Sequence, residues 1–280
     1  MSSFVLDGQE FTLQTKLGSG TQGDTYLYSN NGQLYTVKVV KGIVATRARE
    51  NFERESSILG KLKDTCDINA YPCLRSTFIV NENDIHFLHF KGIRNGGPLA
   101  VMIYNFVPGI PFSDLVNGDG FEIDLVETFL DQILPTVKYL HQNNIIHRDI
   151  KPANIIYNRD TNKFTLIDFG LSCQDTCEGI AGTPNFILPS IMKGEYPKNI
   201  NININKESDV YSVGTVLYMY INKRIPFNLR KRNGDYLYED FGGWSVSIPT
   251  GIQVIIEDII LHPGQGIAGI YEFWTMLRCQ

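Results

Sequence analysis

The spacing of apolar residues changes near Pro108-Gly109, and this change most constrains what the chain can fold into. Before it, short runs rich in β-branched and aromatic residues are typical of strands, and one charged stretch has apolar residues at helical spacing. Strands are predicted at 11–17, 25–29, 33–40, 84–90 and 99–106, and a helix at 46–62. After it, helical spacing predominates, and helices are predicted at 123–141 and 208–221. The sequence therefore predicts an α+β protein with two lobes and a hinge at Pro108-Gly109.

Three local features qualify this pattern. Asn30-Asn31-Gly32 lies between two predicted strands and predicts a hairpin. Pro135 lies inside a predicted helix and is expected to bend it or weaken one turn. The stretch 199–205 alternates Asn and Ile, and we interpret it as an inserted loop, with an extra edge strand as the lesser alternative.

Composition excludes several classes of protein. The formal net charge of −5 shows no basic excess, which argues against a nucleic-acid-binding surface. No apolar run approaches the roughly 18 residues that a membrane span needs. The first residues have no basic region followed by an apolar core, so they do not resemble a signal peptide. We expect a soluble, cytoplasmic protein that binds neither nucleic acid nor membrane.

The cysteines point to no metal site. They form no close Cys-x-x-Cys pair and offer no second pair at zinc spacing: Cys66, Cys73, Cys173, Cys177 and Cys279. Because disulfides are rare in the cytosol, we expect all of these cysteines to be reduced thiols.

A glycine-rich turn is predicted between the first two strands. Gly18, Gly20 and Gly23 have the spacing Gly-x-Gly-x-x-Gly, which alone is a weak signal because dinucleotide-binding folds also use it. In those folds the last glycine opens a helix, whereas residues 25–28 continue here as a strand. A glycine-rich turn between strands can lie over a nucleotide, because the missing side chains let backbone N–H groups approach the phosphates.

Lys38 follows within an apolar predicted strand. A buried lysine is costly without a carboxylate partner. The predicted helix at 46–62 offers Glu50, Glu53 and Glu55. We favour Glu55, because its helical phase faces inward, and Glu53 remains the competitor. Taken alone, Lys38 could equally be a surface lysine that extends its amine into solvent.

Two further motifs follow in order. Residues 147–154 read His-Arg-Asp-Ile-Lys-Pro-Ala-Asn, and residues 168–170 read Asp-Phe-Gly. With the glycine-rich turn and Lys38, they make the sequence similar to the eukaryotic protein kinase family, of the Ser/Thr type. The resemblance runs from about residue 11 to the helix at Tyr211, and more loosely to the C-terminus.

The resemblance implies a bilobal protein-kinase-like fold and a kinase domain over residues 11–280. It comprises a small antiparallel-sheet N-lobe with one main helix (about 11–105), a hinge (about 105–109) and a larger, mainly helical C-lobe (about 110–280).

The resemblance also implies chemical roles. Asp149 would orient the substrate hydroxyl and accept its proton, and Lys151 would steady the γ-phosphate of ATP. Asn154 and Asp168 would hold Mg²⁺, whose preference for hard oxygen ligands suits an amide and a carboxylate.

By the same resemblance, Lys38 would hold the α- and β-phosphates and Glu55 would keep Lys38 in place. Tyr104 aligns with the residue that guards the back of the nucleotide pocket and should close it. The remaining nucleotide contacts would come from Leu17, Gly18, Gly20, Gly23, Thr25, Asn105 and Val107.

Two signals favour Ser/Thr over Tyr as the acceptor. Lys151 lies two places after Asp149, as is usual in family members that phosphorylate Ser or Thr. The segment 182–186, Gly-Thr-Pro-Asn-Phe, resembles the substrate-docking segment of that class, in which Thr183 would contact both residues.

The sequence departs from the family pattern at the end of this segment. Leu188-Pro189-Ser190 stands where the family has Ala-Pro-Glu, and 261–266 lacks the arginine that normally pairs with that glutamate. Losing one partner would strand a buried charge at about 3–5 kcal/mol, whereas losing both can be nearly neutral. The paired absence therefore indicates a structural swap.

The activation segment expected from the resemblance, residues 171–187, contains two candidate phosphorylation sites, Ser172 and Thr176. It also contains Asp175 and Glu178, whose permanent negative charge could pair with Arg148. Our hypothesis is that the protein is active without an upstream kinase.

Two other functions compete with an active protein kinase. A catalytically silent, kinase-like scaffold module usually lacks the strand lysine or one of the catalytic aspartates, which are present here. A small-molecule kinase would not need the docking segment at 182–186. The resemblance favours a protein substrate, and a monomer is the default oligomeric state.

Overall fold

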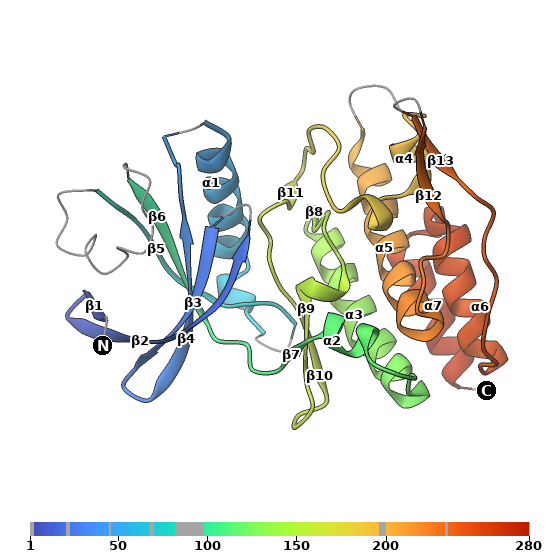
Figure 1. Ribbon diagram of the computed structural model, residues 1–280, viewed down its shortest axis with the longest axis horizontal. Helices are drawn as coiled ribbons and strands as arrows, with labels where there is room; N and C mark the ends of the chain where they lie inside the picture. Colours follow the sequence, from blue (N-terminus) through green and yellow to red (C-terminus); the bar gives the residue numbers. More distant parts are fainter. Residues whose placement is uncertain are drawn as a thin grey trace. The chain divides into compact units, whose positions relative to one another are not determined.

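The structure is a computed structural model that describes residues 3–20, 23–44, 46–67, 70–81, 98–195, 200–232 and 235–279. The chain divides into two compact units, Met1–Val107 and Pro108–Gln280. The first is strand-rich and the second mainly helical (Figure 1), which confirms the predicted α+β class. The strand predicted at 84–90 lies outside the described residues.

The first unit is built on one antiparallel sheet with the strand order β1-β2-β3-β4-β6-β5. The strands are β1 (Ser3–Leu6), β2 (Gln9–Gly20), β3 (Gly23–Asn30), β4 (Gln33–Val40), β5 (Leu74–Val80) and β6 (Leu99–Asn105). Helix α1 (Thr46–Lys61) follows β4 and packs against β5 and β6, and the short 3-10 helix η1 (Lys63–Thr65) follows it.

Alternation along the strands decides which side chains form the core. In β4, Tyr35, Val37 and Val39 are buried in an apolar cluster with Val101 and Ile103 of β6. Because successive strand residues point to opposite faces, the intervening residues of β4 face the side of the sheet on which α1 lies. The sheet thus separates an apolar face from a helix-covered face.

The start of the chain adds a strand that sequence reasoning missed. Strand β1 pairs with β2, and Phe4 stacks on Phe11 with ring centroids 5.0 Å apart. The predicted hairpin between β3 and β4 is confirmed, since Asn31 and Gly32 both have positive φ, of 47° and 79°. Positive φ at both central residues is what a tight hairpin turn requires.

The second unit is built around helices. They are α2 (Phe112–Asn117), α3 (Ile123–Gln142), α4 (Pro189–Met192), α5 (Ile202–Asn222), α6 (Thr250–Leu261) and α7 (Gly266–Arg278). Helix α5 is buried on all sides from Asp209 to Leu217 and contacts α2, α3, α6 and α7. Pro135 lies inside α3, which the structure keeps as a single helix. No helix in the described ranges is long and apolar enough to cross a membrane.

Short strands and 3-10 helices connect these helices, and the predicted catalytic residues lie among them. A three-stranded sheet has the order β10-β9-β7, and β8 pairs with β11. The short strands are β7 (Ile110–Pro111), β8 (Ile145–Ile146), β9 (Ile155–Asn158), β10 (Lys163–Leu166), β11 (Cys173–Gln174), β12 (Leu229–Arg232) and β13 (Asp235–Tyr238). The 3-10 helices are η3 (Pro152–Asn154), η4 (Pro184–Phe186) and η5 (Pro263–Gln265).

The interpretation of 199–205 as a loop or edge strand was wrong for residues 202–205, which are helical. Helix α5 begins at Ile202, six residues before the predicted start at Ser208. Asn201 caps it, because its side-chain oxygen accepts a hydrogen bond from the Ile204 N–H at 3.1 Å. An asparagine cap satisfies an N–H group that the first helical turn leaves unpaired. The alternation of Asn and Ile concealed this start.

The expectation of reduced cysteines was also wrong. Disulfides join Cys66 to Cys73 and Cys173 to Cys177, and Cys279 is free and exposed. The Cα atoms of the two pairs are 5.6 and 5.4 Å apart, within the range that a disulfide needs. Chain reversals bring these near-neighbours together, and spacing alone does not predict such turns.

Gly214 lets α5 approach α6 closely. A Cβ atom at this position would lie 2.7 Å from Ile259 Cγ2 and 2.8 Å from Ile260 Cγ1. We expect Gly214→Ala to lower the free energy of unfolding, because overpacking costs about 1–3 kcal/mol and helix propensity returns only about 1 kcal/mol. Gly269→Ala in α7 is the matched control, since no atom lies within 4 Å of its Cβ position. Urea unfolding should show a loss for Gly214→Ala and no loss for Gly269→Ala; a gain at both positions would contradict this packing.

Candidate active site

The glycine-rich turn lies where β2 ends at Gly20 and β3 begins at Gly23, so strand continues after the last glycine as predicted. Gly23 has a φ of 147°, and a Cβ atom there would overlap the carbonyl oxygen of Val39. Only glycine therefore fits where β3 passes β4. Leu17 is 44% exposed, Gly18 is exposed, and Thr25 is half-buried.

Asp24 adds a charged contact beside this turn. Its buried carboxylate pairs with Lys41 at 2.5 Å and with Lys16 at 3.1 Å. Burial raises the pKa of Asp24, but hydrogen bonds from Lys41, Ser19 and Lys16 outweigh burial and hold the pKa well below its usual range. Sequence reasoning gave Asp24 no role, because one aspartate between Gly and Thr carries no signal.

Lys38 and Glu55 form a buried ion pair. Lys38 Nζ donates to both carboxylate oxygens of Glu55, at 3.0 Å to Oε1 and 2.8 Å to Oε2. The two residues are 8% and 2% exposed, respectively. Glu53, the competing partner, instead pairs with Arg49 on the exposed face of α1 at 2.8 Å. The pair ties α1 to β4, and removing one partner of such a pair typically costs about 3–5 kcal/mol.

Tyr104 touches the same carboxylate. Its hydroxyl donates to Glu55 Oε1 at 3.2 Å, and its side chain is buried. Nearby, the N–H groups of Asn105 and Phe106 donate to the carbonyls of Cys73 and Leu34, at 3.0 and 3.2 Å. In this conformation these two N–H groups are therefore not free to bind a base.

In the second unit, the predicted catalytic residues meet at one carboxylate. Asp149 Oδ2 accepts hydrogen bonds from Lys151 Nζ at 2.7 Å and from Asn154 Nδ2 at 3.0 Å. Asp149 Oδ1 accepts from the Thr183 hydroxyl at 2.7 Å, which itself accepts from Lys151 at 3.0 Å. Four residues singled out from the sequence are thus in direct contact.

The donor chemistry near Asn154 fits a magnesium ion. The side-chain nitrogen of Asn154 is engaged by Asp149, so its oxygen is the atom that can act as a ligand. The Ile167 N–H donates to the backbone carbonyl of Asn154 at 2.8 Å, and Asp168 is the next residue after Ile167. In the described part of the chain no three His, Cys, Asp or Glu residues cluster as a metal site. An amide oxygen from Asn154 and one carboxylate from Asp168 suit Mg²⁺, which is usually bound by one or two protein carboxylates together with phosphates and water.

Six described non-glycine residues of this unit have a positive φ, and two of them, Arg148 and Asp168, belong to the motifs that contain the predicted catalytic and metal-binding residues. Arg148 and Asp168 have φ values of 67° and 61°, a region that non-glycine residues rarely adopt. Strain of this kind persists where the surroundings enforce it, and it gathers at functional sites. Here Phe169, beside Asp168, is fully buried with its ring centroid 4.9 Å from that of His147.

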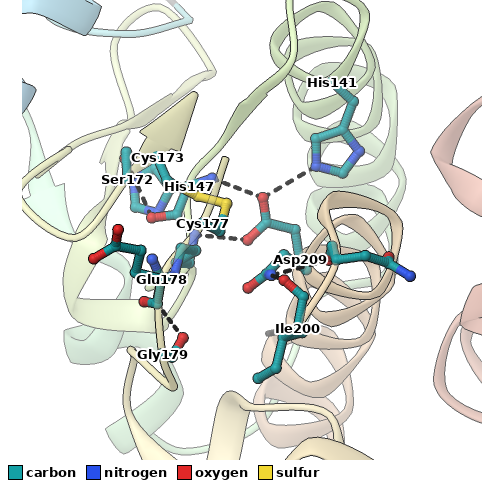
Figure 2. The surroundings of a disulfide bond; sticks show 12 residues. His141, His147, Ser172, Cys173, Cys177, Glu178, Gly179, Ile200 and Asp209 are labelled. Carbon is teal, nitrogen blue, oxygen red and sulfur yellow. Dashed lines mark hydrogen bonds and ion pairs between the residues drawn. A yellow bond between two sulfur atoms is a disulfide. The ribbon is translucent and has the colours of Figure 1, made fainter. Parts of the chain in front are cut away.

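Asp209 enforces the backbone before Asp149. From inside α5, its carboxylate accepts from the N–H groups of His147 and Arg148, both at 2.8 Å, and contacts His141 Nε2 at 3.1 Å (Figure 2). Asp209 is 1% exposed. Sequence reasoning missed this role, and the available signal was that Asp209 is the one charged residue in the helix predicted at 208–221.

Arg148 reaches the activation segment at its backbone. Its Nη2 donates to the backbone carbonyls of Glu178 and Gly179, at 3.0 and 2.8 Å. The Asp175 side chain accepts a hydrogen bond from Asn144 at 3.2 Å. A tight turn, which residue types alone do not predict, brings the carbonyls of this segment to Arg148.

The same segment is fixed at both ends. Near its start, Ser172 is fully buried and donates to the His147 carbonyl at 3.2 Å, so of the two candidate phosphorylation sites only Thr176 is exposed. Near its end, Ser208 and Ser212 of α5 bind the Leu188 N–H and the Phe186 carbonyl. These serines hold the segment whose Ala-Pro-Glu motif is replaced here.

The low pKa of Asp24 predicts a pH dependence. Because the folded-state pKa lies below the ordinary value of 3.8, the stabilisation is fully present above that value, begins to decline as the pH falls past it, and is lost completely as the pH falls through the folded-state pKa. We expect Asp24→Asn to lower the unfolding free energy at neutral pH by about 1–3 kcal/mol and to flatten its decline in acid. Urea unfolding from pH 7 to pH 3 measures both effects, with exposed Asp160→Asn as control. Parallel acid slopes in wild type and Asp24→Asn would refute this.

The disulfide between Cys173 and Cys177 encloses the turn that precedes Glu178 (Figure 2). We expect Cys177→Ser to speed amide hydrogen exchange over 174–182. It should also lower the free energy of unfolding by about 2 kcal/mol, a small value for a disulfide because a short closed loop restricts the unfolded chain only a little. Hydrogen exchange followed by mass spectrometry reports the first effect, with Cys279→Ser as control. Unchanged exchange in Cys177→Ser would show that the disulfide does not hold this turn.

Comparison with known proteins agrees with this geometry. Residues 11–241 match the family described as the protein kinase domain. A probable serine/threonine-protein kinase of Dictyostelium discoideum is 28% identical over 242 residues, which cover 80% of this chain and 30% of that protein. The serine/threonine-protein kinase cds1 of Schizosaccharomyces pombe is 29% identical over 236 residues, covering 79% of this chain and 46% of the relative.

A putative serine/threonine-protein kinase of Acanthamoeba polyphaga mimivirus is 39% identical over 120 residues, covering 40% of this chain and 41% of that protein. The chain thus spans less than half the length of these three curated relatives. The family match covers most of the chain, and its fold is bilobal, as the resemblance implied. The chain belongs to the eukaryotic-type Ser/Thr protein kinase family.

Proposed function

We propose that this chain transfers the γ-phosphoryl group of ATP to Ser or Thr hydroxyls of protein substrates, with Mg²⁺. The observation that carries the proposal is the hydrogen-bonded cluster of Asp149, Lys151, Asn154 and Thr183. Phosphoryl transfer asks a protein mainly to position reactants and to neutralise charge, and this cluster has the groups for both.

The hydrogen bonds indicate which oxygen of Asp149 receives the substrate proton. A carboxylate oxygen has two lone-pair sites. Those of Oδ2 are taken by Lys151 and Asn154, whereas in the described part of the chain Oδ1 accepts only from Thr183. Oδ1 therefore keeps one site for the hydroxyl of a substrate, and a general base must lie within hydrogen-bonding reach of the proton that it accepts.

Each unit would contribute its own residues to the proposed binding of nucleotide and metal. Lys38, oriented by Glu55, binds the α- and β-phosphates, and Asn154 and Asp168 bind Mg²⁺. When bound, Mg²⁺ neutralises charge that develops on the phosphates. The adenine contacts fall to Val107 N–H and the Asn105 carbonyl, because the Asn105 N–H already donates to Cys73.

The glycine-rich turn, with Leu17, Gly18, Gly20, Gly23 and Thr25, completes the proposed nucleotide contacts. Its backbone N–H groups can approach phosphates where side chains are absent.

We extend the proposed kinase domain to residue 280, beyond the family match that ends at residue 241. Helix α7 supports this extension, since it packs on α3 and Trp274 Nε1 donates to Asp131 at 2.8 Å. At the other end, β1 pairs with β2, so the sheet begins before residue 11.

Three further features of the proposal concern partners, location and activation. The substrate is a protein, the chain acts as a monomer, and it is cytoplasmic. The two disulfides argue against a cytoplasmic location, because disulfides are rare in the cytosol. We also infer that the activation segment is ordered without phosphate, since Arg148 binds carbonyls of Glu178 and Gly179 that need no modification.

The deciding experiment incubates purified protein with labelled ATP, Mg²⁺ and a basic protein substrate. We expect label on Ser and Thr, and a loss of about 10²–10⁴-fold in Asp149→Asn, because general base catalysis contributes about that much. Asp160→Asn, an exposed aspartate in the turn between β9 and β10, should match wild type. ADP binding by every variant checks that the fold is intact. If wild type binds ADP but transfers no phosphate, the scaffold-module alternative is favoured.

A further inference from the structure

Tyr104 is held firmly by its own strand. It lies near the end of β6, between Thr36 of β4 and Leu74 of β5, its partners on either side in the sheet. Cross-strand partners point to the same face of a sheet. Thr36 and Tyr104 therefore share a face with Lys38 and its own partner Met102, and this is the face on which α1 lies.

The tyrosine hydroxyl reaches the acceptor that Lys38 also uses. Tyr104 donates to Glu55 Oε1 at 3.2 Å, where Lys38 Nζ donates at 3.0 Å. Met102 Sδ lies 3.4 Å from the same hydroxyl, but a thioether is a weak acceptor and a carboxylate is a strong one. The single hydroxyl proton is therefore directed at Glu55.

A third hydrogen bond to Glu55, from a second donor, changes what the buried ion pair can do. Lys38 alone can follow a carboxylate that rotates about its last bond, because an ammonium group has three equivalent donors. The Tyr104 hydroxyl comes from a different strand and fixes Oε1 in space. With Oε1 held, the positions from which Lys38 Nζ can make both of its bonds to Glu55 are restricted. Glu55 is 2% exposed, so no bulk water competes for these bonds.

We propose that Tyr104 is a positioning residue, whose hydroxyl holds the Glu55 carboxylate and thereby the Lys38 amine in place for the phosphates of the nucleotide. The inference rests on the proposed function, in which Lys38 binds the α- and β-phosphates. The hydroxyl then has a role of its own, separate from the space that the buried ring fills. Phenylalanine keeps the ring and removes the hydroxyl, so the two roles can be separated.

The test compares the dissociation constants of ADP and adenosine, measured by calorimetry. Adenosine carries no phosphates, so a change at Lys38 alters ADP binding alone. We expect Tyr104→Phe to weaken ADP about tenfold, the scale of one hydrogen bond to a charged group, and to leave adenosine within twofold of wild type. In a Glu55→Gln background, the further change Tyr104→Phe should alter ADP binding less than twofold.

Tyr71→Phe is the matched control. Tyr71 is also a buried tyrosine of the first unit, but its hydroxyl donates to the Thr65 carbonyl at 2.8 Å. This variant should lower the melting temperature and leave the ratio of the two dissociation constants unchanged. A merely structural role of the Tyr104 hydroxyl would give the same result for Tyr104→Phe, and that result would overturn the inference.

Lys38→Ala separates failure of this inference from failure of the proposed function. If Lys38→Ala weakens ADP relative to adenosine and Tyr104→Phe does not, the role of Tyr104 is refuted and the proposed function stands. If Lys38→Ala leaves the ratio unchanged, Lys38 does not bind phosphates, and both the proposed nucleotide contacts and the role of Tyr104 are refuted.

Discussion

A charge that is buried must be matched by hydrogen-bonding partners, and this constraint arranges both units of the protein. In the strand-rich unit, Lys38 is tolerated on a covered face of the sheet because Glu55 of α1 accepts its bonds. In the helical unit, Asp209 is tolerated inside α5 because backbone N–H groups donate to it. Each pairing fixes an element next to a proposed reactive group. The hydrogen bonds that make the buried charges tolerable thus also hold the proposed reactive groups in place.

The activation segment shows a second way to hold a loop. A few adjacent residues are held by three kinds of contact: the disulfide between Cys173 and Cys177, the pairing of β8 with β11, and the hydrogen bonds from Arg148 to two carbonyls. At the far end, Ser208 and Ser212 of α5 bind the Leu188 N–H and the Phe186 carbonyl. These neutral hydrogen bonds to the backbone carry none of the desolvation penalty of a buried ion pair.

Sequence reasoning predicted the parts that are determined by residue type at fixed spacing. The strand that continues past Gly23 and the choice of Glu55 over Glu53 followed from local periodicity. Asp24 and the disulfides escaped prediction because their partners are brought together by turns. Asp209 escaped because its partners are backbone groups far away in the sequence, which any residue type supplies. The early start of α5 was hidden because Asn201 reads as a loop residue unless its capping geometry is known.

We propose that the cluster around Asp149, with Asp168, forms the metal- and hydroxyl-binding part of a phosphotransferase. Electron paramagnetic resonance of Mn²⁺, used in place of Mg²⁺, tests it most directly when the metal is titrated into protein with ADP. We expect wild type and Asp160→Asn to bind Mn²⁺ equally in the presence of ADP, and Asp168→Asn and Asn154→Ala to bind it at least tenfold more weakly. Equal Mn²⁺ affinity in all four proteins would show that Asn154 and Asp168 do not hold the metal.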